Sequence, residues 1–198
     1  MKSLIGFVCL PALACSLAAR AQDSGTCAAA FTAPVESGMK LAIGSRSAEI
    51  DIVGTEKNEI GITCTLGDPS RAGEVRIRFH RSGNTSRLEV RGGPDNNVHI
   101  VVQVPRKTDL QLHIPAGEIK VNNVVGDKDV EVWAGELIVS GVDPGTYRQV
   151  RASVGIGEVR ATHYGIDKGG FLRSFDHSSD SGLYRLYAHV TTGEIELN

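Results

Sequence analysis

The sequence predicts an all-β protein, with right-handed parallel β-solenoid-like coils in its C-terminal half and sheet- or sandwich-like strands before them. The first observation is composition: 23 of the 198 residues are glycine and only 5% are aromatic, which is typical of β-repeat proteins. The second is a series of short alternating runs such as 75–79 and 98–104, each followed within a few residues by Gly, Asn, Asp or Pro. The third is a motif beginning with Gly-Glu that recurs along the chain.

The N-terminal segment is interpreted as an export signal. Lys2 supplies a positive charge, residues 4–17 are almost entirely apolar, and Ala19-Arg20-Ala21 matches the small-x-small pattern that signal peptidase cleaves. Fourteen apolar residues are short for a membrane span, which needs about 20. We therefore predict that residues 1–21 are a signal peptide and that the mature protein is soluble, without a transmembrane span, in the periplasm or outside the cell. The alternative of a lipid anchor on Cys15 is less well supported, because Ala occupies the position where a lipoprotein signal usually has Leu.

Two of the four cysteines, Cys27 and Cys64, remain after this cleavage. An even pair of cysteines in an oxidising compartment predicts a disulfide. Neither residue has a partner at the spacing of a metal site, so we expect no metal there. Two separate buried thiols remain the alternative.

The mature chain divides into a lead-in and a repeat domain. Residues 22–38 are small and polar without periodicity, and are predicted to be an N-terminal lead-in. Alternating strands follow from Met39, so residues 39–198 form the predicted β-repeat domain, and the repeat is clearest over residues 104–198.

The repeat begins at residues 117, 135, 157 and 193, at successive distances of 18, 22 and 36 residues. A period near 20 is the length of one coil of a parallel β-solenoid. Glycine permits the bend at a corner, and the apolar third and fifth residues of each motif point inward. The predicted repeat positions are Gly117, Glu118, Ile119, Val121, Gly135, Glu136, Leu137, Val139, Gly157, Glu158, Val159, Gly193, Glu194, Ile195 and Leu197. The alternative is an antiparallel sandwich in which Gly-Glu marks hairpin turns.

These motifs carry a family resemblance. Val104-Pro105, Leu110-Gln111-Leu112 and the series that starts at Gly117 resemble a family of exported bacterial proteins of unknown function that is named for adhesins. The strands of that family form a β-solenoid likened to a toast rack. The resemblance covers residues 39–198 and implies a non-enzymatic, adhesin-like protein of the cell envelope. The segment 165–181 interrupts the repeat pattern.

The second residue of each motif is expected to point outward. Stacked coils would place Glu118, Glu136 and Glu158 in one column, with Lys120 and Arg160 close enough to relieve its charge. An outward column without such relief would instead favour Ca²⁺, but the chain has no Asp-rich calcium loop.

No motif for catalysis, metal binding or a cofactor is found, so we predict none of these. The segment 176–181 contains Asp, His and Ser, but neighbours on one loop rarely converge as a catalytic triad does. The histidines form no short-spaced ligand pair and are expected to be ordinary sheet residues; they are His80, His99, His113, His163, His177 and His189.

The expected function is an interaction or structural module of the envelope whose partner is a protein or a polysaccharide. A net charge of −2 gives no support to nucleic-acid binding. The alternative is an exported carbohydrate-active enzyme on a β-helix scaffold, which needs two carboxylates projecting from neighbouring coils. The candidates for that pair are Asp127, Asp129, Glu131 and Glu118.

Overall fold

The structure is a computed structural model that describes residues 21–94 and 96–198, and it confirms the all-β prediction. Within these described residues, thirteen strands form one mixed sheet. The strands are β1 (Ala21–Thr26), β2 (Phe31–Pro34), β3 (Met39–Gly44), β4 (Glu49–Thr55), β5 (Glu59–Leu66), β6 (Arg76–Ser82), β7 (Thr85–Arg91), β8 (Val98–Pro105), β9 (Thr108–Asn122), β10 (Lys128–Val139), β11 (Tyr147–Ala161), β12 (Ile166–Ser178) and β13 (Tyr184–Leu197). Two short 3-10 helices are η1 (Pro69–Glu74) and η2 (Thr162–Tyr164). The predicted signal peptide lies, but for Ala21, outside the described residues. No helix within the described ranges has the length and apolar character needed to cross a bilayer.

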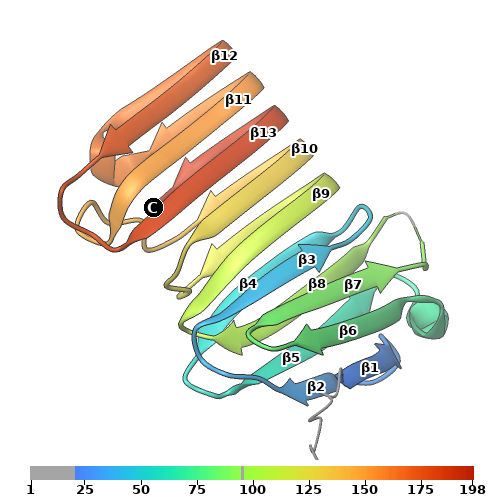
Figure 1. Ribbon diagram of the computed structural model, residues 1–198. Coiled ribbons are helices and arrows are strands. Elements are labelled where there is room, and N and C mark those ends of the chain that lie inside the picture. Colours follow the sequence, from blue (N-terminus) through green and yellow to red (C-terminus); the bar gives the residue numbers. More distant parts are fainter. Residues whose placement is uncertain (1–20, 95) are drawn as a thin grey trace, which may run out of the picture.

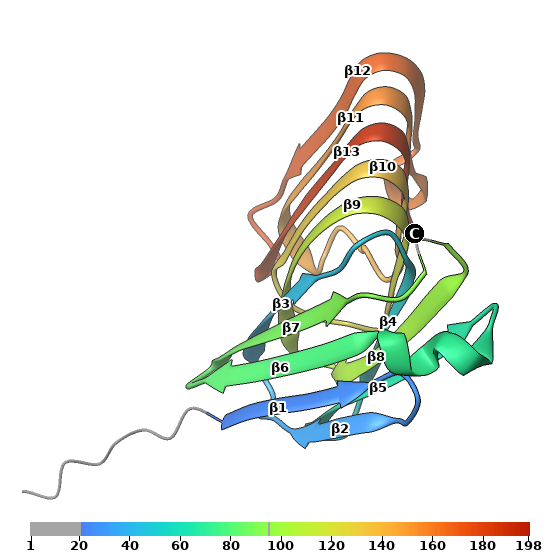
Figure 2. The same ribbon diagram turned by 90° about the vertical axis from the view of Figure 1, so that its right-hand side faces the viewer.

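Five long strands, β9 to β13, form the part of the sheet that we call the rack (Figure 1). β9, β10, β13 and β11 lie side by side and parallel, and β12 pairs with β11 in the antiparallel direction. Each strand bends midway, so that the rack is a row of arches (Figure 2). We call the half of each strand before its bend the first arm and the half after it the second arm.

The bend of each parallel strand lies at the glycine of its repeat motif. Gly117, Gly135, Gly193 and Gly157 are opposite one another in successive strands, with φ between 138° and 141°. A Cβ added to Gly193 would lie 1.7 Å from the backbone oxygen of Gly135. Side chains are therefore excluded from the corner both by the backbone angle and by the neighbouring strand.

The order of the strands differs from a simple succession of coils. β13 lies between β10 and β11, although it follows β12 in the chain. The 36 residues between Gly157 and Gly193 are about twice the distance of 18 between the first two motifs, but they hold η2 and the antiparallel edge strand β12 rather than an additional parallel strand. The sheet is consequently mixed, and its parallel part is not in sequence order.

The apolar repeat positions face the inside of the arches. Ile119, Leu137, Val159 and Ile195 are each at most 1% exposed. Ile138, the residue after Leu137, lies on the outer row and is half-buried. Alternation along the strand therefore separates a packed interior from a polar outside.

Beyond β9 the two arms continue as separate strands, which we call the split region. The first half of β9 pairs with β3 and the second half pairs with β4. One arm then runs β3–β7–β6–β1 and the other β4–β8–β5–β2. The rings of Phe31 in β2 and Phe79 in β6 pack 6.2 Å apart, so the two arms enclose a common core. The predicted lead-in, residues 22–38, contains β2 and all of β1 except Ala21, and these strands are part of the sheet.

The predicted disulfide is present between Cys27 and Cys64, whose Cα atoms are 5.3 Å apart. Cys27 follows β1 at the end of one arm, and Cys64 lies in β5 of the other. The disulfide therefore links the two arms where no bent strand does so.

Lys128, the first residue of β10, is buried, with 1% of its surface exposed. Its ammonium donates hydrogen bonds to the carbonyl oxygens of Val124 (2.9 Å) and Gly126 (3.4 Å) and to the hydroxyl of Tyr147. Burial lowers the pKa of Lys128 from its ordinary value of 10.5 to about 8. The lysine closes the turn between β9 and β10 from inside the core.

Candidate functional site

Outward side chains of the second arm form a line of carboxylates that crosses five strands. Glu118, Glu136, Glu194 and Glu158 are successive cross-strand neighbours in β9, β10, β13 and β11. Glu49 continues the line in β4, because the next residue of that strand is opposite Ile119 of β9. We call these five residues the glutamate row.

The predicted order of this column needs one correction. Glu194 lies between Glu136 and Glu158, because β13 is inserted between their strands. The two predicted cations are in place: Lys120 Nζ is 2.5 Å from Glu118 Oε1, and the Arg160 guanidinium is 2.6 Å from Glu158 Oε1.

Glu136, in the middle of the row, is electrostatically strained. Partial burial raises its pKa, and the neighbouring Glu118, Glu194 and Glu196 raise it further. The row is thus neutralised near its ends and most negative at its centre.

Outward side chains of the first arm form paired polar contacts. His113 Nδ1 is 3.0 Å from Glu131, and the Arg151 guanidinium is 2.5 Å from Asp176. Ser153 Oγ is 2.9 Å from His189 Nδ1. In a hydrolase triad the serine contacts one ring nitrogen and a carboxylate orients the other, whereas the Nε2 of this histidine faces Thr191 at 3.5 Å. The contact has the geometry of a surface hydrogen bond.

The Asp-His-Ser segment of β12 does not converge on one point. Asp176 pairs with Arg151 on the outside of the sheet. His177 packs on the other side against Tyr164, with ring centroids 4.8 Å apart. Adjacent residues of a strand point to opposite faces, which separates these two side chains.

The four carboxylates considered for glycan hydrolysis are divided between the two arms. Asp129 and Glu131 lie on the first arm of β10, whereas Glu118 lies past the corner on the second arm of β9. Asp127 accepts a hydrogen bond from the backbone N–H of Arg185 (2.8 Å). Glu118 is therefore not brought together with Asp129 and Glu131.

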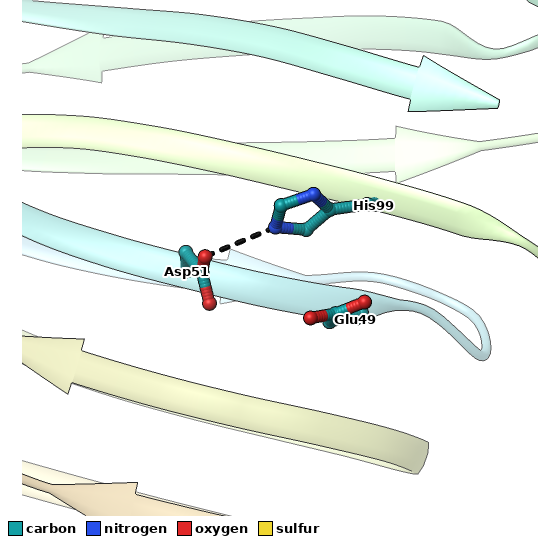
Figure 3. A group of neighbouring side chains, drawn as sticks. All are labelled: Glu49, Asp51 and His99. Carbon is teal, nitrogen blue, oxygen red and sulfur yellow. Dashed lines mark hydrogen bonds and ion pairs between the residues drawn. The ribbon is translucent and has the colours of Figure 1, made fainter.

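Among the described residues, one group of potential metal ligands does converge, at the split-region end of the glutamate row (Figure 3). Glu49 and Asp51 are two residues apart in β4, and His99 of the adjacent strand β8 is opposite Glu49. One ligating atom of each residue lies within 4.8 Å of the other two. His99 Nε2 is 3.0 Å from Asp51 Oδ2.

The sequence interpretation missed this group because its members are far apart in the chain. In the sequence, Glu49 and Asp51 alternate with apolar residues, as the outward residues of any half-buried strand do. The available signal was that Glu49 and Asp51 are two positions apart and therefore lie on the same face of one strand. The parallel pairing of β4 with β8, which adds His99 to them, could not be predicted from the sequence.

Large apolar side chains are exposed along the corner of the rack. Four of them, Trp133, Ile156, Phe171 and Leu172, are between 50% and 85% exposed. Phe171 of β12 is opposite Ile156 of β11, and the line continues through Thr192 of β13 to Ala134 of β10, beside Trp133. We call these six residues the corner ridge.

The comparisons with known proteins bear on the fold. No protein-family model matches the chain, and no curated protein matches its sequence significantly. Among solved structures, the chain is similar to one described as a "putative cell adhesion protein" from Clostridium sporogenes. That similarity has a TM-score of 0.51 at 14% identity and covers 85% of this chain and 98% of the other. At this identity it shows a shared fold.

Proposed function

We propose that this protein is an exported, non-enzymatic interaction module of the cell envelope, adhesin-like in its role. In this proposal the rack is a short β-solenoid-like stack that holds a binding surface rigid. The partner is a protein or a polysaccharide, and the corner ridge is the contact surface.

The corner ridge is the observation that carries this proposal. Exposed apolar side chains that gather on one surface are typical of interaction sites, and aromatic residues are enriched there. Trp133 and Phe171 lie on two different strands, so their relative position is set by the sheet rather than by a flexible loop. A rigid aromatic contact loses little conformational entropy on binding.

Two further observations support the proposal. The Cys27–Cys64 disulfide fits an oxidising compartment, as export requires. The structural neighbour from Clostridium sporogenes is itself described as a "putative cell adhesion protein".

The test measures binding of the purified protein to immobilised polysaccharides and extracellular-matrix proteins. We expect saturable binding to at least one of them, and at least a tenfold loss of affinity in the double variant Trp133→Ala/Phe171→Ala. Leu183→Ala is the matched control, because Leu183 is 78% exposed but lies outside the ridge. Equal loss in the control would contradict the ridge as the contact surface.

The same samples distinguish the alternative of a carbohydrate-active enzyme. New reducing ends that accumulate in proportion to protein concentration and time would show hydrolysis. The double variant Asp129→Asn/Glu131→Gln would then abolish their release, and the non-enzymatic proposal would be wrong.

A further inference from the structure

We propose that Glu49, Asp51 and His99 form a binding site for one divalent transition-metal ion, with Zn²⁺ as its representative. The proposal is independent of the corner ridge, which lies on the rack.

Strand geometry directs the three side chains to one point. Residues two apart in a strand project from the same face, which places Glu49 and Asp51 together above β4. His99 comes from the neighbouring strand at the position opposite Glu49. The ligands are therefore fixed by sheet pairing on two rigid strands rather than by a loop.

The distances are close to those that a metal requires. Two ligand atoms bound to one tetrahedral Zn²⁺ are about 3.4 Å apart, because each metal–ligand bond is about 2.1 Å. His99 Nε2 and Asp51 Oδ2 are already 3.0 Å apart, and all three ligating atoms lie within 4.8 Å of one another. A small rotation of the Glu49 side chain completes the set, and solvent supplies the fourth ligand.

The site also holds an unused acceptor. Within the described part of the chain, Asp51 Oδ1 is shielded from solvent and has no hydrogen-bond partner. A shielded carboxylate oxygen without a partner is costly, and a cation held by both carboxylate oxygens of Asp51 would remove that cost. The side chains of the three residues are between 25% and 43% exposed, so an ion can reach them from solvent.

The chemistry of the ligands selects the class of metal. Imidazole nitrogen with carboxylate oxygen suits Zn²⁺ and its neighbours in the transition series. Ca²⁺ prefers six to eight oxygen ligands, which this group does not supply. Two carboxylates balance the charge of a dication when the imidazole is neutral.

Lys120 is the competitor for this site. Its ammonium lies 3.5 Å from Glu49 Oε1, but it holds Glu118 more closely, at 2.5 Å. Lys120 therefore makes its weaker contact with Glu49, and metal binding requires Glu49 to give up only this contact. Replacing Lys120 should free Glu49 and strengthen metal binding.

The test is a calorimetric titration of the tag-free, full-length mature protein with ZnCl₂, repeated with CaCl₂. We expect one Zn²⁺ per chain, a rise in melting temperature on binding, and at least tenfold weaker binding in His99→Gln and in Asp51→Asn. Lys120→Gln should bind Zn²⁺ several-fold more tightly. Circular dichroism and melting curves recorded without metal establish that each variant folds. Because both His99→Gln and Asp51→Asn are measured, the proposal can still be tested if one of the two variants does not fold.

His113→Gln is the matched control. His113 is also 3.0 Å from a carboxylate, that of Glu131, but the described residues place no third ligating group beside that pair. It should bind Zn²⁺ as the wild type does. Unchanged affinity in both His99→Gln and Asp51→Asn, an equal loss in His113→Gln, or preference for Ca²⁺ would each overturn the proposal.

Discussion

In the rack every parallel strand crosses from one arm to the other, whereas in the split region each arm has strands of its own. β9 shows the change directly, since its continuous chain is matched on one side by β10 and on the other by the two strands β3 and β4. The backbone itself sets the angle between the arms in the rack. In the split region that task falls to loops, core packing and one disulfide.

The two regions maintain the angle between their arms in different ways. A continuous strand can turn the corner only with glycine, because the neighbouring strand fills the space that a Cβ would need. The loop 45–48 between β3 and β4 turns the same corner without a glycine, and the backbone N–H of Ala48 donates to the carbonyl oxygen of Ala116 in β9 (3.3 Å). The rack should therefore be sensitive to substitution at its corners, and the split region to loss of its crosslink.

The largest effect is expected at the corner. Gly193→Ala should lower the free energy of unfolding by more than about 4 kcal/mol, because its Cβ would overlap the backbone of β10. Urea unfolding followed by circular dichroism measures the change. Gly145→Ala is the control, since a Cβ there meets nothing within 4 Å and should change stability by less than about 0.5 kcal/mol. Similar midpoints for the two variants would show that the corner is not sterically closed.

Loss of the disulfide should act on the split region. Cys27→Ser/Cys64→Ser opens a crosslink between residues separated by 37 positions, and should cost about 2–4 kcal/mol. Hydrogen exchange should show faster exchange in β1 and β5 and unchanged protection in β10 and β13. Equal loss of protection in all four strands would mean that the two regions unfold as one unit.

The buried Lys128 makes the stability of the rack depend on pH. Its pKa is lower in the folded than in the unfolded state, so the free energy of unfolding is smallest below pH 8 and increases as the pH rises toward 10.5. We expect a gain of roughly 2 kcal/mol between pH 7.5 and pH 9.5. Urea melts at both pH values measure it, and Lys128→Met should remove this gain. If the free energy of unfolding of the wild type changed as little between these two pH values as that of Lys128→Met, the Lys128 ammonium would be solvated in the folded protein.

The smallest effect is expected in the glutamate row. The pKa of Glu136 is raised in the folded state, so its ionised form destabilises the protein at neutral pH and this cost disappears as the pH falls. Glu136→Gln should therefore gain about 0.5 kcal/mol at pH 7 and nothing near pH 4. Glu118→Gln should show no gain, because it removes the ion pair with Lys120. If both variants had a higher free energy of unfolding than the wild type, the gain would come from the net charge of the protein rather than from the position of Glu136 in the glutamate row.

The sequence predicted the parts of this fold that repeat locally. Alternation in 117–121 and its copies placed Ile119 and Leu137 inside, and a Gly-Glu pair marked each corner. The pairing of the two remaining cysteines followed from their number and compartment.

What the sequence could not supply was the order in which strands meet. Nothing in the segment 162–183 states that β12 pairs at the edge or that β13 returns to the middle. The Glu49–Asp51–His99 group depends on the pairing of β4 with β8, whose paired residues are 50 positions apart in the chain. Such long-range pairing is decided by the packing of the whole sheet and leaves no local trace.

The central position of β13 has a consequence for how the chain folds. Until β13 forms, β10 and β11 each present an open edge, and their Gly-Glu motifs are alike enough to pair with each other in the register that β13 later occupies. That pairing satisfies the same hydrogen bonds and buries the same kinds of side chain, so it competes with the native arrangement. β13 can enter only when the two strands separate by one strand width, about 4.8 Å. We therefore expect the repeat that stabilises the finished rack to slow its refolding, because a pairing of β10 with β11 has to open before β13 can enter.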